Sequence, residues 1–167
     1  PPKIISSQLK AVLSDFKLAA AKIGMLFNAE IMKEVFQKLK DAKFPIVVDP
    51  ILSTGTGYSL ILKNDLEYFK KVIVPMSYLI TPNLPEAEAI SGIKIRSTDE
   101  LMDAANTLLD MGAANVIIKG GHSTKSKGIT DFLLTRERRV IRFKKERTRT
   151  NSLHGLGCNF SAAITAE

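Results

Sequence analysis

Short apolar runs alternate with stretches of helical spacing along this chain of 167 residues, and no other feature restricts its fold as strongly. The apolar runs, each short enough to be one strand, cover 18–26, 45–50, 77–83 and 115–121. Helical patterns lie between them. This order predicts an α/β fold in which a mostly parallel sheet is flanked by helices on both faces. No linker or repeat divides the chain, so we expect a single domain.

A basic segment near the C-terminal end predicts two further strands. Residues 130–135 and 138–145 read as short strands joined by a polar turn. We expect them to form an antiparallel hairpin at the edge of the sheet. The cationic residues of the second strand alternate in part with apolar ones. This pattern favours one solvated cationic face over a nucleic-acid-binding patch.

The helical stretches carry start and stop signals. The expected N-caps are Ser6 or Ser7, Asn28, Asn64 and Ser97. Glu100 completes a capping-box pattern with Ser97, and Gly112 is expected to end that helix. The helix that follows Asn28 has one apolar stripe, formed by Ile31, Met32, Val35, Phe36 and Leu39.

Composition excludes several classes of protein. The chain is 45% hydrophobic and 25% charged, like ordinary globular proteins, and no apolar run approaches membrane-spanning length. Its single cysteine cannot form an internal disulfide, and no signal peptide is recognisable, so we expect a cytoplasmic protein. The net charge of +7 favours anionic ligands such as phosphorylated metabolites. We expect neither a nucleic-acid nor a membrane partner.

Polar or glycine-rich motifs follow all four predicted parallel strands. They are Gly24-Met25, Asp49-Pro50, Thr81-Pro82-Asn83 and Lys119-Gly120-Gly121. In open α/β sheets, ligands bind beyond the carboxyl ends of the strands. We therefore expect these motifs to gather along one rim of the sheet, which indicates an enzyme rather than a structural protein.

Each rim motif also has a purely structural interpretation. Asp49 could cap a turn or offer a carboxylate to Mg²⁺. Asn83 and Glu86, three residues apart at a helix start, could form a capping box or supply oxygen ligands to a metal. Lys119 could be solvated, or it could neutralise the phosphates of a nucleotide that the following glycines let approach.

The segment "HGLGCNFSAAI" carries the single cysteine, Cys158, after a glycine turn. Gly155 and Gly157 allow a tight turn into a helix, whose first N–H groups and dipole favour an anion. A thiol at such a position is stabilised in its charged form. The alternative is an inert cysteine buried behind the turn.

Six segments, in order, resemble the hydroxymethylpyrimidine phosphate kinases of thiamin biosynthesis, a ribokinase-like family. These segments are "KIGML", "VVDPIL", "LITPNLPEAEAI", "VIIKGGH", "TDFLLT" and "HGLGCNFSAAI". The resemblance implies a ribokinase-like three-layer sandwich with a mostly parallel sheet and an antiparallel edge hairpin. It also implies that 1–167 is one kinase domain, incomplete at both termini, and that the protein is a homo-oligomer.

The implied reaction is ATP-dependent phosphorylation of 4-amino-5-hydroxymethyl-2-methylpyrimidine phosphate, and of the free alcohol, with ATP and Mg²⁺ as cofactors. The resemblance assigns the catalytic base to Cys158 and the phosphoryl-binding turn to Gly155 and Gly157. The remaining implied roles are nucleotide binding by Asn83, Lys119 and Gly121, metal binding by Asp49 and Glu86, and pyrimidine binding by Met25. The alternatives are a pyridoxal kinase of the same fold and a non-catalytic ligand-sensing domain.

Two positions depart from the family pattern. Leu156 stands where relatives usually have threonine, which removes a hydroxyl from the phosphoryl-binding turn. Gly55 stands where a lysine is common, which leaves one cation fewer for the phosphate of the substrate.

Overall fold

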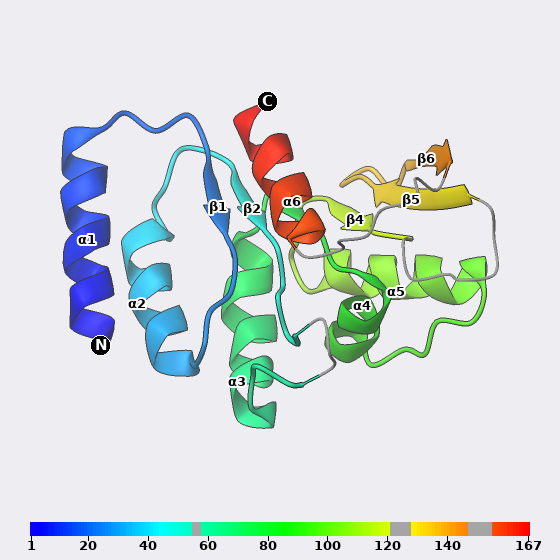
Figure 1. Ribbon diagram of the computed structural model, residues 1–167, viewed down its shortest axis with the longest axis horizontal. Helices are drawn as coiled ribbons and strands as arrows, with labels where there is room; N and C mark the ends of the chain where they lie inside the picture. Colours follow the sequence, from blue (N-terminus) through cyan, green and yellow to red (C-terminus); the bar gives the residue numbers. More distant parts are fainter. Residues whose placement is uncertain (55–57, 121–127, 147–154) are drawn as a thin grey trace.

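One six-stranded sheet organises the computed structural model, which describes residues 1–54, 58–120, 128–146 and 155–167 (Figure 1). Across the sheet the strands follow chain order: β1 (Ala21–Ile23), β2 (Ile46–Val48), β3 (Leu79–Ile80), β4 (Val116–Ile118), β5 (Gly128–Leu134) and β6 (Val140–Glu146). Strands β1 to β4 are parallel, and β5 and β6 add to β4 as an antiparallel hairpin. The predicted sheet and its edge hairpin are confirmed.

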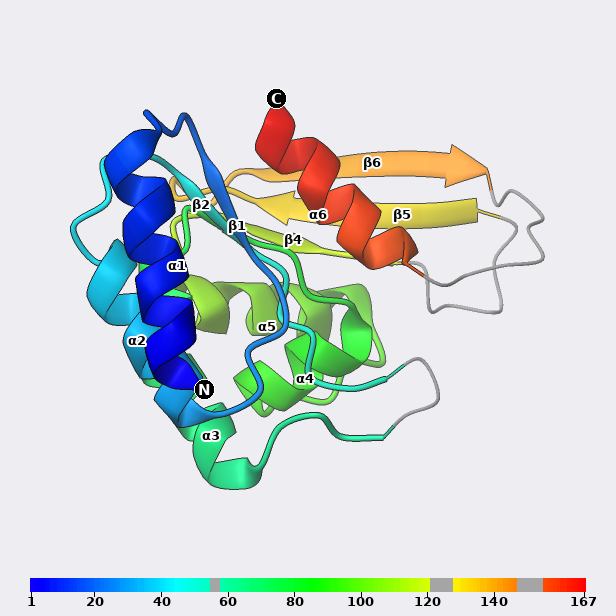
Figure 2. The same cartoon turned by 60° about the vertical axis from the view of Figure 1, so that its left-hand side comes forward.

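Helices cover the two faces of the sheet unequally. They are α1 (Pro2–Asp15), α2 (Ala29–Leu39), α3 (Lys63–Tyr68) with its π-helical and 3₁₀ continuations (Phe69–Ile73 and Val74–Met76), α4 (Leu84–Ser91), α5 (Thr98–Asp110) and α6 (Leu156–Ala166). Right-handed crossovers between parallel strands in chain order place the connecting helices on one face, and α2 to α5 pack there together. Helix α6 crosses the other face (Figure 2). Within the described segments, no helix has both the length and the apolarity to cross a membrane.

The predicted N-caps at Asn28 and Ser97 are confirmed. The Asn28 side chain accepts a hydrogen bond from the Ile31 amide at 3.0 Å, and the Ser97 hydroxyl accepts one from the Glu100 amide at 3.2 Å. Glu100, however, accepts from the Arg96 amide at 2.6 Å, one residue earlier than in a capping box. Gly112, with φ of 108°, ends α5 as expected.

Two predicted N-caps are wrong. Helix α1 begins at Pro2, whose fixed φ suits the first helical position, so Ser6 and Ser7 lie inside the helix. Helix α3 begins at Lys63, and the residue that caps it is Leu62 rather than Asn64. The predicted first strand is also too long, because β1 ends at Ile23 and glycine follows it.

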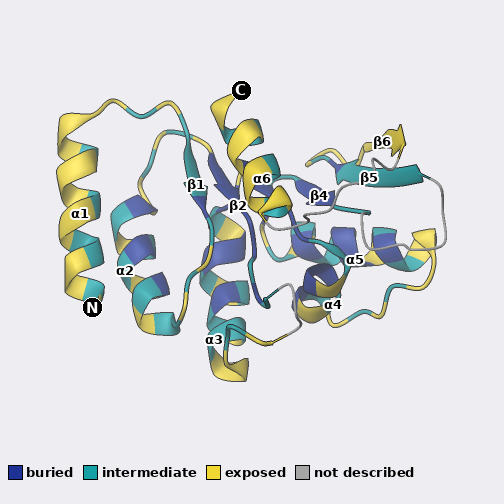
Figure 3. Cartoon of the chain, in the orientation of Figure 1, coloured by how far each residue is buried: buried dark blue, intermediate teal, exposed yellow. Residues whose placement is uncertain are grey.

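Strand alternation sorts the apolar residues onto two faces. Val48, Ile80 and Ile118 are fully buried against α2 to α5, in what we call the main core. Their neighbours one residue earlier, Val47, Leu79 and Ile117, point to the opposite side and pack with Phe160 and Ile164 of α6. We call this second side the α6 face. Figure 3 shows buried residues concentrated in β2, β4 and the helices behind them.

The hairpin is the least buried part of the sheet. Every residue of β6 is exposed, so the prediction of a single solvated cationic face is too narrow (Figure 3). Arg142 lies 5.8 Å from the centre of the Phe132 ring on β5. At the turn, Arg138 has φ of 59° and donates a hydrogen bond of 2.6 Å to Asp110 at the end of α5. The hairpin is therefore fixed to α5 by an exposed ion pair.

Candidate active site

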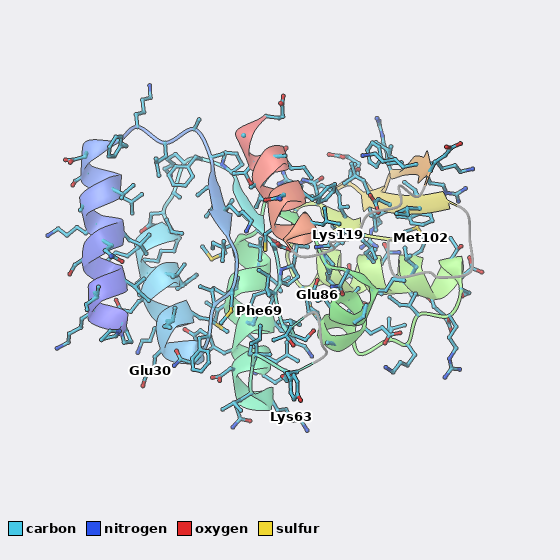
Figure 4. All side chains as sticks on the ribbon, viewed as in Figure 1. Glu30, Lys63, Phe69, Glu86, Met102 and Lys119 are labelled. Carbon is cyan, nitrogen blue, oxygen red and sulfur yellow. The ribbon has the colours of Figure 1, made fainter. Side chains whose placement is uncertain are left out.

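Three polar residues on the α6 face follow directly from strand alternation. Asp49, Thr81 and Lys119 each come one residue after a buried side chain of the main core, so each points to the other side of the sheet. Because β2, β3 and β4 are parallel, their carboxyl ends meet at one rim. Figure 4 shows Lys119 in the middle of the molecule, near the first turn of α6.

Asp49 is the centre of this cluster. It is 2% exposed, and its Oδ1 accepts a hydrogen bond of 3.0 Å from the Lys119 ammonium. Oδ2 accepts one of 3.0 Å from the Ser161 hydroxyl, and the Lys22 ammonium lies 3.9 Å from the same oxygen. Thr81 Oγ1 lies 3.5 Å from Oδ1. A buried carboxylate is tolerated because charged and polar donors surround it.

Ser161 attaches α6 to the rim. Its hydroxyl is 3.1 Å from the carbonyl oxygens of Gly157 and Cys158, but its one proton makes the stronger, charge-assisted bond to Asp49. Ser161 is fully buried and lies one helical turn after Cys158. The first turn of α6 is therefore held directly above the Asp49–Lys119 pair.

Asn83 and Glu86 form the capping box that the sequence suggested. The Asn83 side chain accepts from the Glu86 amide at 2.9 Å, and Glu86 accepts from the Asn83 amide at 2.7 Å. The Lys119 amide donates to the carbonyl of Pro82 at 2.9 Å, which brings the start of α4 beside the end of β4. Burial raises the pKa of Glu86 to about 7, against the lowering effects of the Asn83 hydrogen bond and the Lys119 charge.

The glycine turn presents Cys158 to solvent. Gly155 caps α6 with φ of 77°, and the first helical bond runs from the Asn159 amide to its carbonyl at 2.9 Å. Cys158 is an exposed free thiol, so the interpretation as a buried cysteine is wrong. A Cβ at Gly157 would lie 3.4 Å from the Lys119 ammonium, which brings this turn next to Lys119. Leu156, the departure from the family pattern, is exposed.

Within the described part of the chain, the remaining predicted site residues form no hydrogen bond or ion pair with Asp49. Met25 follows β1 and is 48% exposed. Gly121 and Gly55 lie outside the described residues. Gly120 is close to β5: its amide donates to Asp131 at 2.8 Å, and a Cβ there would collide with the Thr130 carbonyl. Residue 120 must therefore be glycine for β4 and β5 to pair as they do.

A hollow of about 340 Å³ adjoins the cluster on the α4 side. It lies between the loop after β2 and the start of α4, and Leu52, Ser59, Lys63 and Glu86 are among its lining residues. A larger hollow of about 870 Å³ lies at the opposite, amino end of the strands and is lined mainly by apolar residues such as Ile46 and Tyr78. The polar cluster is therefore confined to the carboxyl end.

Lys22 and Ser161 are members of this cluster that we did not single out from the sequence, and Thr81 appears there only within a rim motif, with no role of its own. The two-residue period of β1 and β3 could have identified Lys22 and Thr81, since both alternate with core residues. Ser161 could have been identified from its position, four residues after Gly157 on the same side of a helix.

Solved structures with the same fold share this arrangement of elements. The pyridoxal kinase from Staphylococcus aureus in complex with ADP matches with a TM-score of 0.88 and 31% identity, over 99% of this chain and 60% of that one. A phosphomethylpyrimidine kinase from Clostridium difficile matches with a TM-score of 0.77 and 30% identity, over 99% of this chain and 75% of that one. The fold is therefore that of the ribokinase-like kinases.

The family within this fold class is shown by sequence. The family model described as phosphomethylpyrimidine kinase matches residues 1–167. The hydroxymethylpyrimidine/phosphomethylpyrimidine kinase of Haemophilus influenzae is 42% identical over 100% of this chain and 63% of its own length. The chain belongs to the phosphomethylpyrimidine kinase family, and it spans less than two thirds of the length of that relative.

Proposed function

We propose that this protein is a kinase of thiamin biosynthesis. It transfers the γ-phosphoryl group of ATP to 4-amino-5-hydroxymethyl-2-methylpyrimidine and to its monophosphate. The observation that carries the proposal is the buried Asp49–Lys119 pair directly below the first turn of α6, which bears Cys158. Membership of the phosphomethylpyrimidine kinase family supports the substrate, and the ADP complex of the S. aureus pyridoxal kinase supports ATP as the donor.

Lys119 and Asn83 bind the nucleotide in this proposal, together with Gly121, which lies outside the described residues. The Lys119 ammonium donates to Asp49, and the Lys119 side chain is 16% exposed, so it can still approach a phosphate. The N–H groups in the first turn of α6, after Gly155 and including that of Gly157, have no acceptor within the helix. They are suited to the oxygens of the transferring phosphoryl group, whose charge they stabilise in the transition state.

The acidic residues suit Mg²⁺ held partly through water. Asp49 and Glu86 offer hard carboxylate oxygens, but these oxygens already accept hydrogen bonds from Lys119, Ser161 and the Asn83 amide. In the described part of the chain, no group of three or more His, Cys, Asp or Glu side chains forms a ligand cage. Mg²⁺ commonly takes one or two carboxylates with waters and substrate phosphates. Asp49 and Glu86 would hold the ion in that way, and its charge would offset that of the phosphates.

Cys158 is the proposed base for the alcohol acceptor. As the hydroxymethyl oxygen attacks the γ-phosphorus and the bond to ADP breaks, the thiolate takes the hydroxyl proton. Met25 is proposed to line the pyrimidine pocket, since it is half exposed in the loop that leaves the same rim. A cytoplasmic location and self-association remain predictions from the sequence.

The test is steady-state turnover of the intact protein with ATP, Mg²⁺ and the pyrimidine alcohol. We expect Cys158→Ala to lower kcat by about 10²- to 10⁴-fold, because general-base catalysis contributes on that order. The control is Ala162→Ser, an exposed position of α6, which should stay close to wild type. If kcat is unchanged in Cys158→Ala, Cys158 is not the base. If the wild-type protein shows no turnover, the kinase proposal is wrong and the ligand-sensing alternative is favoured.

A second candidate is a pyridoxal kinase. It is favoured by one observation: the S. aureus pyridoxal kinase has a TM-score of 0.88, against 0.77 for the C. difficile phosphomethylpyrimidine kinase. The values of kcat/KM for pyridoxal and for the pyrimidine alcohol, measured side by side on one preparation, distinguish the two.

A further inference from the structure

Lys22 is a second ammonium group on the buried carboxylate of Asp49. It lies in β1 beside Ile23 of the main core, so alternation directs it to the α6 face. Its ammonium is 3.9 Å from Oδ2, whereas that of Lys119 is 3.0 Å from Oδ1. Among the described residues, the Lys22 ammonium forms no hydrogen bond. Its three N–H donors are therefore available to a ligand.

Gly24 keeps the space around this ammonium open. A Cβ at residue 24 would lie 3.1 Å from Lys22 Nζ, which is closer than side chains normally approach. Gly24 does not have a positive φ, so its backbone conformation does not require glycine. Gly157 lies beside Lys119, with 3.4 Å between its notional Cβ and Nζ, which is an ordinary van der Waals distance. A side chain at residue 24 would therefore displace the Lys22 ammonium, whereas one at residue 157 would only contact that of Lys119.

The charges around Asp49 favour an anion. Two ammonium groups share one buried carboxylate, so this group of three carries one positive charge. The Lys22 side chain is 22% exposed, so the surplus charge can be reached from solvent.

The two lysines approach Asp49 on the same face of the sheet, from strands that lie on either side of β2. Lys119 follows β4, next to the glycines proposed to receive the nucleotide, whereas Lys22 lies on β1, just before Met25 in the proposed pyrimidine pocket. We propose that Lys22 binds the phosphate of the acceptor substrate. This inference rests on the proposed function and adds to it a residue that distinguishes the two acceptors.

The second phosphorylation is the step that needs this cation. An oxygen of the acceptor phosphate attacks the γ-phosphorus of ATP, the bond to the ADP oxygen breaks, and a diphosphate forms. Two anionic groups must come within bonding distance, so an additional cation offsets their repulsion. The hydroxymethyl group of the free alcohol carries no such charge and needs Lys22 much less.

The experiment measures kcat/KM of the intact protein for the monophosphate and for the free alcohol, with Lys22→Gln and wild type. We expect the variant to lose about 10- to 100-fold with the monophosphate, as for hydrogen bonds to charged groups, and only a few-fold with the alcohol. The control is Lys94→Gln, an exposed lysine three residues after the end of α4, which should not alter the ratio. An equal loss with both acceptors, or no loss, overturns the proposal.

A second variant moves the charge without removing it. Gly24→Ala keeps Lys22 but displaces its ammonium, so we expect a smaller selective loss with the monophosphate. A Gly24→Ala protein that handles both acceptors as wild type does contradicts the proposed position of Lys22.

Calorimetric titration without ATP separates this proposal from the kinase proposal. Wild type should bind the monophosphate more tightly than the alcohol, and Lys22→Gln should weaken only the monophosphate, by about 10- to 100-fold. If wild type turns over neither acceptor but shows this binding difference, the kinase proposal fails and the role of Lys22 stands. If Lys22→Gln binds the monophosphate as wild type does, the role of Lys22 fails whatever the turnover.

Discussion

The two faces of the sheet bury different kinds of side chain, although the same strands form both. On the face covered by α2 to α5, nearly all buried side chains are apolar. On the α6 face, a small apolar cluster around Val47, Leu79 and Ile117 lies beside a polar cluster centred on Asp49. One step along a strand separates the two environments, since Val48 is fully buried in the main core and Asp49 is the next residue.

This difference shows how one fold can provide both stability and chemistry. The main core stabilises the protein through apolar burial, which scales with buried area and needs no exact charge arrangement. The α6 face instead depends on donors and charges that compensate one another around a single buried carboxylate. We therefore expect substitutions on the α6 face to act through broken charge pairs, and substitutions on the other face to act through cavities.

The largest effect should come from Asp49→Asn. The change removes the charge that compensates the partly buried Lys119 ammonium, and breaking a buried pair typically costs about 3–5 kcal/mol. Urea unfolding of wild type and variant measures the loss. The matched control is Glu67→Gln, which breaks an ion pair of the same 3.0 Å length with Lys70, in which Glu67 is 53% exposed. We expect less than about 1 kcal/mol there. Similar losses at both sites would remove the contrast between buried and exposed pairs.

Adjacent residues of β4 allow a direct comparison of the two faces. Ile118 is fully buried in the main core, whereas Ile117 belongs to the smaller cluster under α6. Substitution of a buried isoleucine by alanine costs about 2–5 kcal/mol, more where neighbours cannot collapse into the cavity. We expect Ile118→Ala near the upper end of this range and Ile117→Ala near the lower end, both from urea unfolding. Equal losses would mean that the α6 face is packed as tightly as the main core.

The sequence predicts the alternation of elements better than it predicts the contacts between them. The period-two pattern and the N-cap at Asn28 depend on residues close together in the chain, and both are confirmed. The bond from Ser161 to Asp49 joins positions 112 residues apart, and no local pattern indicates it. The wrong N-cap at Ser6 or Ser7 has a similar cause, because Pro2 starts α1 without any side-chain cap.

The same limit applies to the candidate site. Strand ends identify Asp49 and Lys119, because parallel strands bring such positions to one rim whatever the details of packing. Lys22 lies two residues before the rim motif of its own strand, and its long side chain reaches Asp49. The role proposed for Lys22 depends on the space beside Gly24, and the sequence does not indicate that space because it forms only when the strands pair in the sheet.

The last of these effects depends on pH and concerns Glu86, at the border between the two faces. Burial raises the pKa of Glu86 from 4.5 to about 7, so the folded state binds its proton more tightly than the unfolded state does. The free energy of unfolding should therefore decrease as pH rises from about 4.5 to about 7, by about 3 kcal/mol at most. Glu86→Gln can still accept the Asn83 amide but has no proton to lose. The difference in stability between wild type and variant should follow this decrease.

Urea unfolding at several values between about pH 5 and pH 8 tests the difference. Glu100→Gln is the control, since Glu100 also accepts a backbone N–H group at a helix start but is partly exposed and has a lowered pKa. A lowered pKa gives a contribution that is present above the ordinary pKa and lost only on acidification, so the Glu100→Gln difference should stay flat in this range. If the wild-type and Glu86→Gln curves run parallel from pH 5 to pH 8, Glu86 is ionised in the folded protein throughout. The border between the two faces would then carry a second buried carboxylate whose charge is compensated, as that of Asp49 is.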